Sequence, residues 1–122
     1  MGKSVCVLED DEGIRDVIIL LLKEENYDVT GFSSVEDFNL NAKNLMPDLF
    51  LLDVMLPDGS GLDVCSVLKT TENTKNIPVL MMSAHAKISE INRSCNAQGF
   101  ISKPFDIYDL LKRVDHQLNL PS

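Results

Sequence analysis

Residues 49–53 read LFLLD, and the chain continues as VMLPDGSGLDV over residues 54–64. An apolar run of this length, entered through Pro47, is typical of a β-strand that is buried on both faces. The run ends in one carboxylate, Asp53, and a turn rich in proline and glycine follows. The stretch therefore predicts a central strand that delivers an aspartate to the edge of a sheet, where the glycines let the backbone turn away and leave the carboxylate open.

Short apolar runs alternate with helical periodicity along the rest of the chain. Strands are predicted at residues 4–8, 27–32, 49–53, 78–83 and 99–102. Apolar residues at helical spacing predict helices over residues 12–22, 35–45, 61–72, 86–97 and 107–118. Five strands alternating with five helices indicate an α/β fold with a parallel sheet covered on both faces. An open, doubly wound sheet suits this length, because a closed eight-stranded barrel needs roughly 250 residues.

Length and charge restrict the class of protein. A chain of 122 residues is expected to form one domain over residues 1–122, with its core over residues 3–118. The net charge of −8 argues against direct binding to nucleic acid or to an anionic membrane, since both require a basic surface. The chain has neither a membrane-length apolar run nor a signal-peptide pattern, so we expect a cytoplasmic protein. Its three cysteines lack metal-ligand spacing and are predicted to be buried thiols.

Polar side chains stand at or just past the carboxyl ends of four predicted strands. They are Glu9, Asp10, Asp11, Asp53, Ser83 and Lys103, the last followed by Pro104. Taken singly, the acids and the serine could be helix caps and the lysine a solvated side chain. Because parallel strands end at one edge of a sheet, we expect these groups to lie close together. Clustered carboxylates repel one another, and one lysine cannot neutralise them, so such a cluster takes up protons or binds a cation. Oxygen ligands favour Mg²⁺, or Mn²⁺, with a phosphate as a further ligand.

Four motifs in this order resemble the response-regulator receiver domain, the CheY-like phosphoacceptor half of two-component signalling. They are VLEDDEGIR (7–15), LLDVMLPDGSG (51–61), MMSA (81–84) and GFISKPF (99–105). The resemblance covers nearly the whole chain and implies the flavodoxin-like strand order 2-1-3-4-5. It also implies a signalling protein that catalyses only its own phosphorylation and dephosphorylation.

The resemblance implies roles for the matching residues. Asp53 would accept the phosphoryl group, Lys103 would form an ion pair with that group, and Ser83 would hydrogen-bond one of its oxygens. Phe100 occupies the position of the switch aromatic residue, and the peptide bond that precedes Pro104 would be cis.

The implied metal site uses the same edge of the sheet. Asp10, Asp53 and the backbone carbonyl of Met55 would ligate Mg²⁺ directly, and Glu9 would act through a water molecule. The phosphoryl donor would be a phosphohistidine of a sensor histidine kinase or of a phosphotransfer domain.

Slow self-dephosphorylation and a change of surface would follow phosphorylation. Met55 and His85 stand two residues past Asp53 and Ser83, so they would flank the attacking water. The face formed by residues 86–118 would signal to a partner or an output domain. The sequence leaves open a phosphorylation-dependent dimer, and it fits a stand-alone receiver, a relay protein or one domain of a longer regulator or hybrid kinase.

Other readings of the same fold are weaker. A haloacid-dehalogenase-type phosphatase expects a second aspartate two residues after the nucleophile, where this chain has Met55. A flavin carrier needs a phosphate-binding loop after the first strand, but EDDEG (9–13) would repel a phosphate. A phosphorylation-independent interaction module would not need the whole set of acidic residues, serine and lysine.

Overall fold

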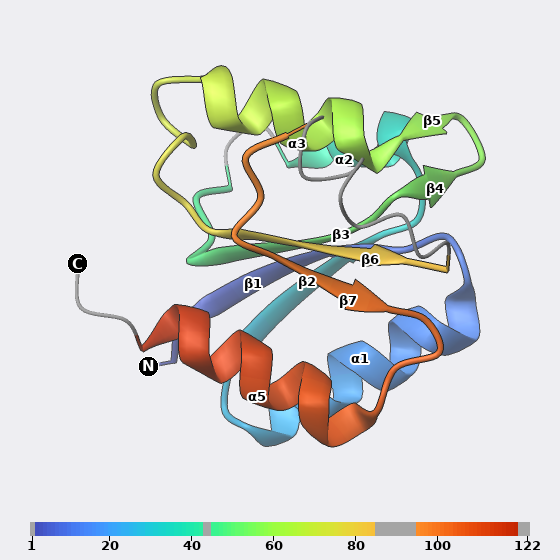
Figure 1. The fold of residues 1–122 in the computed structure, drawn as a ribbon, viewed down its shortest axis with the longest axis vertical. Coiled ribbons are helices and arrows are strands. Elements are labelled where there is room, and N and C mark those ends of the chain that lie inside the picture. Colours follow the sequence, from blue (N-terminus) through green and yellow to red (C-terminus); the bar gives the residue numbers. More distant parts are fainter. Residues whose placement is uncertain (1, 43–44, 85–94, 120–122) are drawn as a thin grey trace.

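The fold is built on a five-stranded parallel sheet that crosses the middle of Figure 1. The computed structural model describes residues 2–42, 45–84 and 95–119. The sheet strands are β1 (Ser4–Leu8), β2 (Asp28–Phe32), β3 (Leu49–Asp53), β6 (Val79–Ser83) and β7 (Gly99–Ser102). A separate short hairpin consists of β4 (Met55–Leu56) and β5 (Gly59–Ser60). The helices are α1 (Glu12–Glu24), α2 (Val35–Asn41), α3 (Gly61–Thr70) and α5 (Ile107–Leu118).

The strand order confirms the predicted doubly wound topology. The five strands lie in the order β2-β1-β3-β6-β7, which is the order 2-1-3-4-5 when the short hairpin is left out. The predicted helix over residues 86–97 lies almost wholly outside the described residues, and residues 95–97 are not helical.

β3 is the central strand, as its apolar sequence predicts. All five of its residues are buried, and Leu51 pairs with Val7 of β1 on one side and with Leu80 of β6 on the other. A strand paired on both edges and covered on both faces has no solvated surface, which explains its uninterrupted apolar sequence.

Helices cover both faces of the sheet and create two apolar cores. Figure 1 shows α2 and α3 on one face and α1 and α5 on the other. The core under α2 and α3 contains Phe38, Phe50 and Cys65. The core under α1 and α5 contains residues such as Ile18 and Val114. This layered packing leaves the carboxyl ends of the strands open at one edge of the sheet.

Two predicted helices are shorter in the structure. The C-terminal cap of α2 is Ala42, whose N–H donates to the carbonyl of Phe38. Leu45 was predicted to lie in this helix, but it lies beyond the helix end and packs on the core from there. α3 ends at Thr70 because Thr71 has an extended backbone, and the Thr71 hydroxyl donates to the carbonyl of Val67 at 2.6 Å. Residues 54–60, predicted as a turn, contain the β4–β5 hairpin.

The three cysteines, Cys6, Cys65 and Cys95, are free and buried, which confirms their predicted role as small apolar side chains. Within the described ranges, the chain contains no helix with the length and apolar character that a bilayer span requires.

Candidate functional site

The turn from β1 into α1 places the first two acidic residues of the site. Glu9 is completely buried, and its N–H donates to the carbonyl of Phe32 at 3.0 Å, which continues the β1–β2 pairing by one residue. Its own carbonyl accepts from the Arg15 guanidinium at 2.8 Å. Asp11 caps α1 by accepting from the N–H of Ile14 at 2.9 Å, and the N–H of Asp11 donates to the Glu9 carboxylate at 3.2 Å. Hydrogen bonds to β2 and to α1 therefore hold the backbone of this turn.

Asp53 ends β3 with a side chain that is almost completely buried. The N–H of Val54 donates to the carbonyl of Met82 at 2.9 Å, and the N–H of Gly61 donates to the carbonyl of Val54 at 2.8 Å. A Cβ atom at Gly61 would lie 1.8 Å from the Asp53 carbonyl oxygen, so only glycine allows α3 to begin against this backbone. The predicted reason for the glycines was a turn conformation, but no glycine in the described part of the chain has a positive φ, and close approach is the reason at Gly61.

Lys103 reaches the carboxylates from the end of β7. Its ammonium donates to Asp53 Oδ2 at 2.9 Å and also forms an ion pair with Glu9 Oε1. Its backbone N–H donates to the carbonyl of Ser83 at 2.8 Å, which joins the ends of β6 and β7. Ser83 is buried, and the Lys103–Pro104 peptide bond is cis. Residues from three strand ends, far apart in the sequence, thus meet at one point.

Burial and charge act against each other in this cluster. Burial raises the pKa of Glu9, and although the hydrogen bond from Lys103 lowers it, the pKa stays above its usual value. Burial lowers the pKa of Lys103, but the hydrogen bonds to Glu9 and Asp53 outweigh this effect and raise the pKa above its usual value. Lys103 is therefore held as a cation between two buried acidic side chains.

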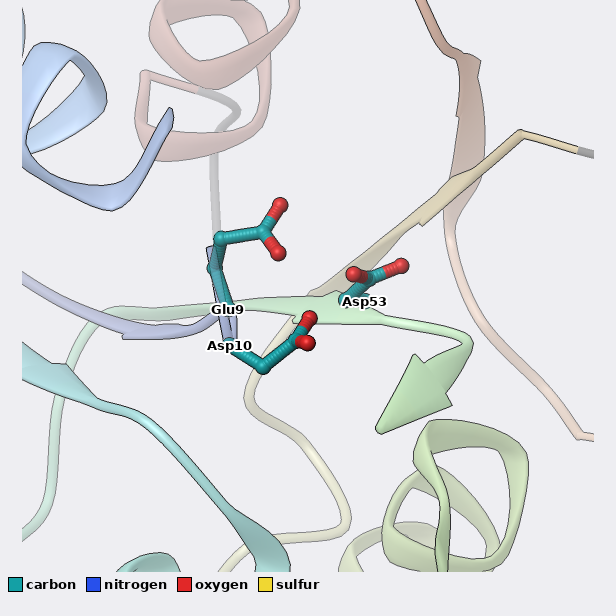
Figure 2. Close-up of side chains that lie close together, drawn as sticks. All are labelled: Glu9, Asp10 and Asp53. Atoms are coloured by element: carbon teal, nitrogen blue, oxygen red, sulfur yellow. The ribbon is translucent and has the colours of Figure 1, made fainter. Parts of the chain in front are cut away.

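The acidic cluster is suited to a hard metal cation. One carboxylate oxygen from each of Glu9, Asp10 and Asp53 lies within 4.8 Å of the others, and Figure 2 shows the three side chains gathered at the ends of β1 and β3. Asp10 is exposed, so the cluster can be reached from solvent. Three carboxylates face one ammonium group, which leaves an excess of negative charge that a divalent cation with oxygen ligands can neutralise.

The remaining predicted site residues lie around this cluster. The backbone of Met55 begins β4 two residues after Asp53, and its side chain is 62% exposed. Phe100 is half-buried on β7 and packs against the core under α2 and α3. His85 lies outside the described residues, as do residues 86–94 of the predicted signalling face.

Sequence reasoning missed two residues that shape the site. Arg15 holds the carbonyl of Glu9, and Asp58 binds the backbone at the start of α2. An arginine one turn into an amphipathic helix and an aspartate in a glycine-rich turn are both common surface features. The partners of Asp58 lie 22 and 23 residues earlier in the chain, so no local pattern indicates them. Arg15 has a partner only six residues away, but nothing in the helical pattern indicates that its side chain turns back to that carbonyl.

The family of the chain follows from comparison with known sequences. The response regulator receiver domain family matches residues 5–115, and the chain belongs to this family. Two curated relatives are the DNA-binding dual master transcriptional regulator RpaA of Synechocystis and the phosphate regulon transcriptional regulatory protein PhoB of Escherichia coli. RpaA is 35% identical, and the match covers 90% of this chain and 46% of RpaA. PhoB is 34% identical, and the match covers 93% of this chain and 51% of PhoB. The chain thus spans about half the length of these relatives.

Solved receiver domains share the fold. The non-phosphorylated HemR receiver domain of Leptospira biflexa is 29% identical, with a TM-score of 0.89 over 98% of this chain and 97% of its own. The chemotaxis response regulator CheY4 of Vibrio cholerae has a TM-score of 0.88 over 96% of this chain and 99% of its own, and at 21% identity it supports the fold alone. The predicted family is therefore confirmed: the chain is a receiver domain of two-component, phosphorylation-based signalling.

Proposed function

We propose that Asp53 accepts a phosphoryl group from a phosphohistidine of a sensor histidine kinase or a phosphotransfer domain. The observation that supports this most is the Lys103 ammonium 2.9 Å from Asp53 Oδ2, within a cluster of three carboxylates of which Asp53 is one. Without the ammonium of Lys103 and a cation at the acidic cluster, the carboxylates would repel the incoming phosphoryl oxygens. Positioning and charge neutralisation supply most of the rate in phosphoryl transfer, and this edge of the sheet can supply both.

The proposed step is an in-line displacement at phosphorus. A carboxylate oxygen of Asp53 forms the new O–P bond as the N–P bond of the phosphohistidine breaks. The other ring nitrogen of the phosphohistidine carries a proton, so the products are an acyl phosphate and a neutral histidine. Lys103 shifts its ion pair from the carboxylate to the phosphoryl oxygens, and Ser83 donates a hydrogen bond to one of them. Asp10, Asp53 and the Met55 carbonyl would hold Mg²⁺ directly, with Glu9 acting through water. Bound there, Mg²⁺ would offset the charge between the nucleophile and the phosphoryl group.

A small phosphodonor tests this proposal without a kinase. The chain is incubated with acetyl phosphate and Mg²⁺, and its intact mass is followed over time. We expect one added phosphoryl group in the wild type, a strong decrease when Mg²⁺ is chelated, and no addition in Asp53→Asn. An unmodified wild type, or a modified Asp53→Asn, would refute the assignment.

An apolar groove beside the site supports docking of the donor. The groove has a volume of about 590 Å³, lies between the start of α1 and the segment after β7, and has Lys103 in its wall. Its apolar lining includes Ile14, Val17, Pro104 and Phe105. We propose that a donor helix packs its apolar face here and so brings its phosphohistidine to Asp53.

The proposed output is a shift in the populations of two conformations at Ser83 of β6 and Phe100 of β7. Ser83 and the segment after it would close on the phosphoryl group, and Phe100 would repack with the face over residues 86–118. We propose that residues 1–122 make one receiver domain in the cytoplasm, which loses its phosphoryl group slowly and acts on a partner, an output domain or a second copy of itself. The DNA-binding function in the name of RpaA suggests one kind of output for a longer protein.

A further inference from the structure

The tip of the β4–β5 hairpin is attached to the start of α2 by one side chain. Asp58 Oδ1 accepts from the N–H of Val35 at 2.9 Å, and Asp58 Oδ2 accepts from the N–H of Glu36 at 2.9 Å. Ser34, the local cap, accepts from the N–H of Asp37 at 3.0 Å. The first three N–H groups of α2 are therefore bound by side chains, two of them by a residue 22 or 23 positions further along the chain.

Charge and packing support this attachment. The hydrogen bonds from the N–H groups of Glu36 and Val35 lower the pKa of Asp58 below its usual value, which favours the ionised carboxylate. A negative group at a helix start also interacts favourably with the helix dipole. Gly59 lies against α2 as well, since a Cβ atom there would be 3.2 Å from Cγ2 of Val35. The tip of the hairpin is thus both packed and hydrogen-bonded onto the helix.

The base of the hairpin is fixed separately, by the sheet and by α3. The N–H of Val54 donates to the carbonyl of Met82 in β6, and the carbonyl of Val54 accepts from the N–H of Gly61. The Ser60 hydroxyl caps α3 by accepting from the N–H of Leu62 at 3.1 Å. Between base and tip, Met55 pairs with Ser60. Figure 1 shows the hairpin beside the ends of α2 and α3. The position of the Met55 backbone therefore depends on attachments at both ends of a very short ribbon.

We propose that Asp58 is a positioning residue for the metal site: by binding α2 it holds the hairpin, and with it the Met55 carbonyl, where a cation at Asp10 and Asp53 can be ligated. This inference depends on the proposed Mg²⁺ binding and adds to it. Asp58 is not one of the clustered carboxylates, Glu9, Asp10 and Asp53, and its two oxygens accept from amides of α2 instead. Its effect is to make the site ready before the cation arrives.

The consequence is a change in Mg²⁺ affinity with little change in chemistry. When only a fraction of molecules has the hairpin in place, the apparent dissociation constant rises by the inverse of that fraction. For Asp58→Ala we expect a dissociation constant about three- to fivefold higher, measured by isothermal titration calorimetry on the complete chain. Asp58→Asn keeps one acceptor oxygen, so an intermediate increase is expected. The phosphorylation rate with acetyl phosphate at saturating Mg²⁺ should return to the wild-type value.

A control must separate the effect of removing a negative charge from the effect of releasing the hairpin. Asp63→Asn removes the same charge from an exposed site on α3, and we expect its dissociation constant to stay near the wild-type value. Raising the ionic strength screens long-range attraction between exposed charges, so the difference between Asp58→Ala and Asp63→Asn should persist in high salt.

The outcomes distinguish a failure of the proposed function from a failure of the role proposed for Asp58. A wild type that binds no Mg²⁺ contradicts the proposed function itself. A wild type that binds Mg²⁺, with Asp58→Ala unchanged or with Asp63→Asn weakened equally, contradicts the role of Asp58 alone. If Asp58→Ala does not fold, as judged by circular dichroism, Asp58→Asn decides the matter in the same way. A reduced rate at saturating Mg²⁺ would show that Asp58 acts on the transfer step, which also contradicts the inference.

Discussion

At the scale of single residues, Lys103 provides the positive charge that two buried carboxylates share. Replacing it by methionine keeps much of the volume but leaves Glu9 and Asp53 without this cation, and the phosphoryl group loses its counter-ion. We expect phosphorylation by acetyl phosphate to slow by about a hundredfold, the usual effect of removing one preorganised donor from a transition state. The time course of intact mass measures this rate. Lys112→Met, at an exposed position of α5, is the control, and equal rates in the two variants would contradict the prediction.

Gly61 gives a second prediction at the residue scale. A Cβ atom 1.8 Å from the Asp53 carbonyl forces the start of α3 away from the phosphoacceptor strand. Gly61→Ala should therefore lower the free energy of unfolding by about 2 kcal/mol or more, as measured by urea denaturation. Gly13→Ala on α1 is a matched control, because the new methyl group would meet only the tip of the Asp11 side chain at 3.3 Å. A Gly61→Ala protein as stable as Gly13→Ala would show that the backbone yields easily.

The site residues that could be predicted from sequence are those that stand at strand ends. Glu9, Asp10, Asp53 and Lys103 each stand at or just past the end of a strand that the sequence predicts, and a parallel sheet brings such ends together. Asp58 could not be predicted, because its role depends on amides of a helix 22 residues earlier and not on a local pattern. Arg15 binds a carbonyl only six residues earlier, but an arginine early in an amphipathic helix is a common surface feature, so the sequence does not signal this bond.

At the scale of elements, the exposed face of α1 can be tested as the surface that receives the donor. Val17 is 45% exposed and lines the groove beside the site. Val17→Glu should reduce phosphoryl transfer from a phosphorylated histidine phosphotransfer domain by about tenfold, since a charge would replace an apolar contact in the docked complex. Labelling by acetyl phosphate should not change, because this small donor needs no docking surface.

The control for α1 comes from the same helix. Leu20 is 59% exposed and is not among the residues that line the groove, so Leu20→Glu tests the effect of a new charge elsewhere on α1. A decrease in transfer that is equal in both variants would indicate a general charge effect instead of docking at the groove. A decrease in acetyl phosphate labelling by Val17→Glu would indicate damage to the site.

Element boundaries were less predictable than element types. Long apolar runs and amphipathic spacing depend on burial over many residues, so they predict the sheet strands and α1 correctly. The end of α2 depends instead on where the backbone of Ala42 is capped, and the β4–β5 hairpin depends on pairing between Met55 and Ser60. Both depend on a few local contacts that leave no periodic pattern in the sequence.

At the scale of the whole molecule, hydrogen bonds between distant parts of the chain join the outer elements. Lys3 donates to the carbonyl of Leu118, at the end of α5, at 2.6 Å. The Tyr27 hydroxyl, just before β2, donates to the Asp115 carboxylate of α5. These bonds connect an edge strand and the N-terminal segment to the last helix, so α5 contributes to the stability of the whole sheet.

The Tyr27–Asp115 bond predicts a pH dependence of stability. Burial, followed by the bond to Asp115, raises the pKa of Tyr27 to about 12, compared with about 10 in an unfolded chain. The folded state therefore favours the neutral phenol: its stabilising contribution is complete below about pH 10 and is lost as the pH rises through about 12. Tyr27→Phe should be less stable than the wild type by about 1 kcal/mol at neutral pH, and this difference should decrease above about pH 10. Urea denaturation of both proteins across this range measures the difference, and a constant or growing gap at alkaline pH would contradict a protonated Tyr27 as the donor.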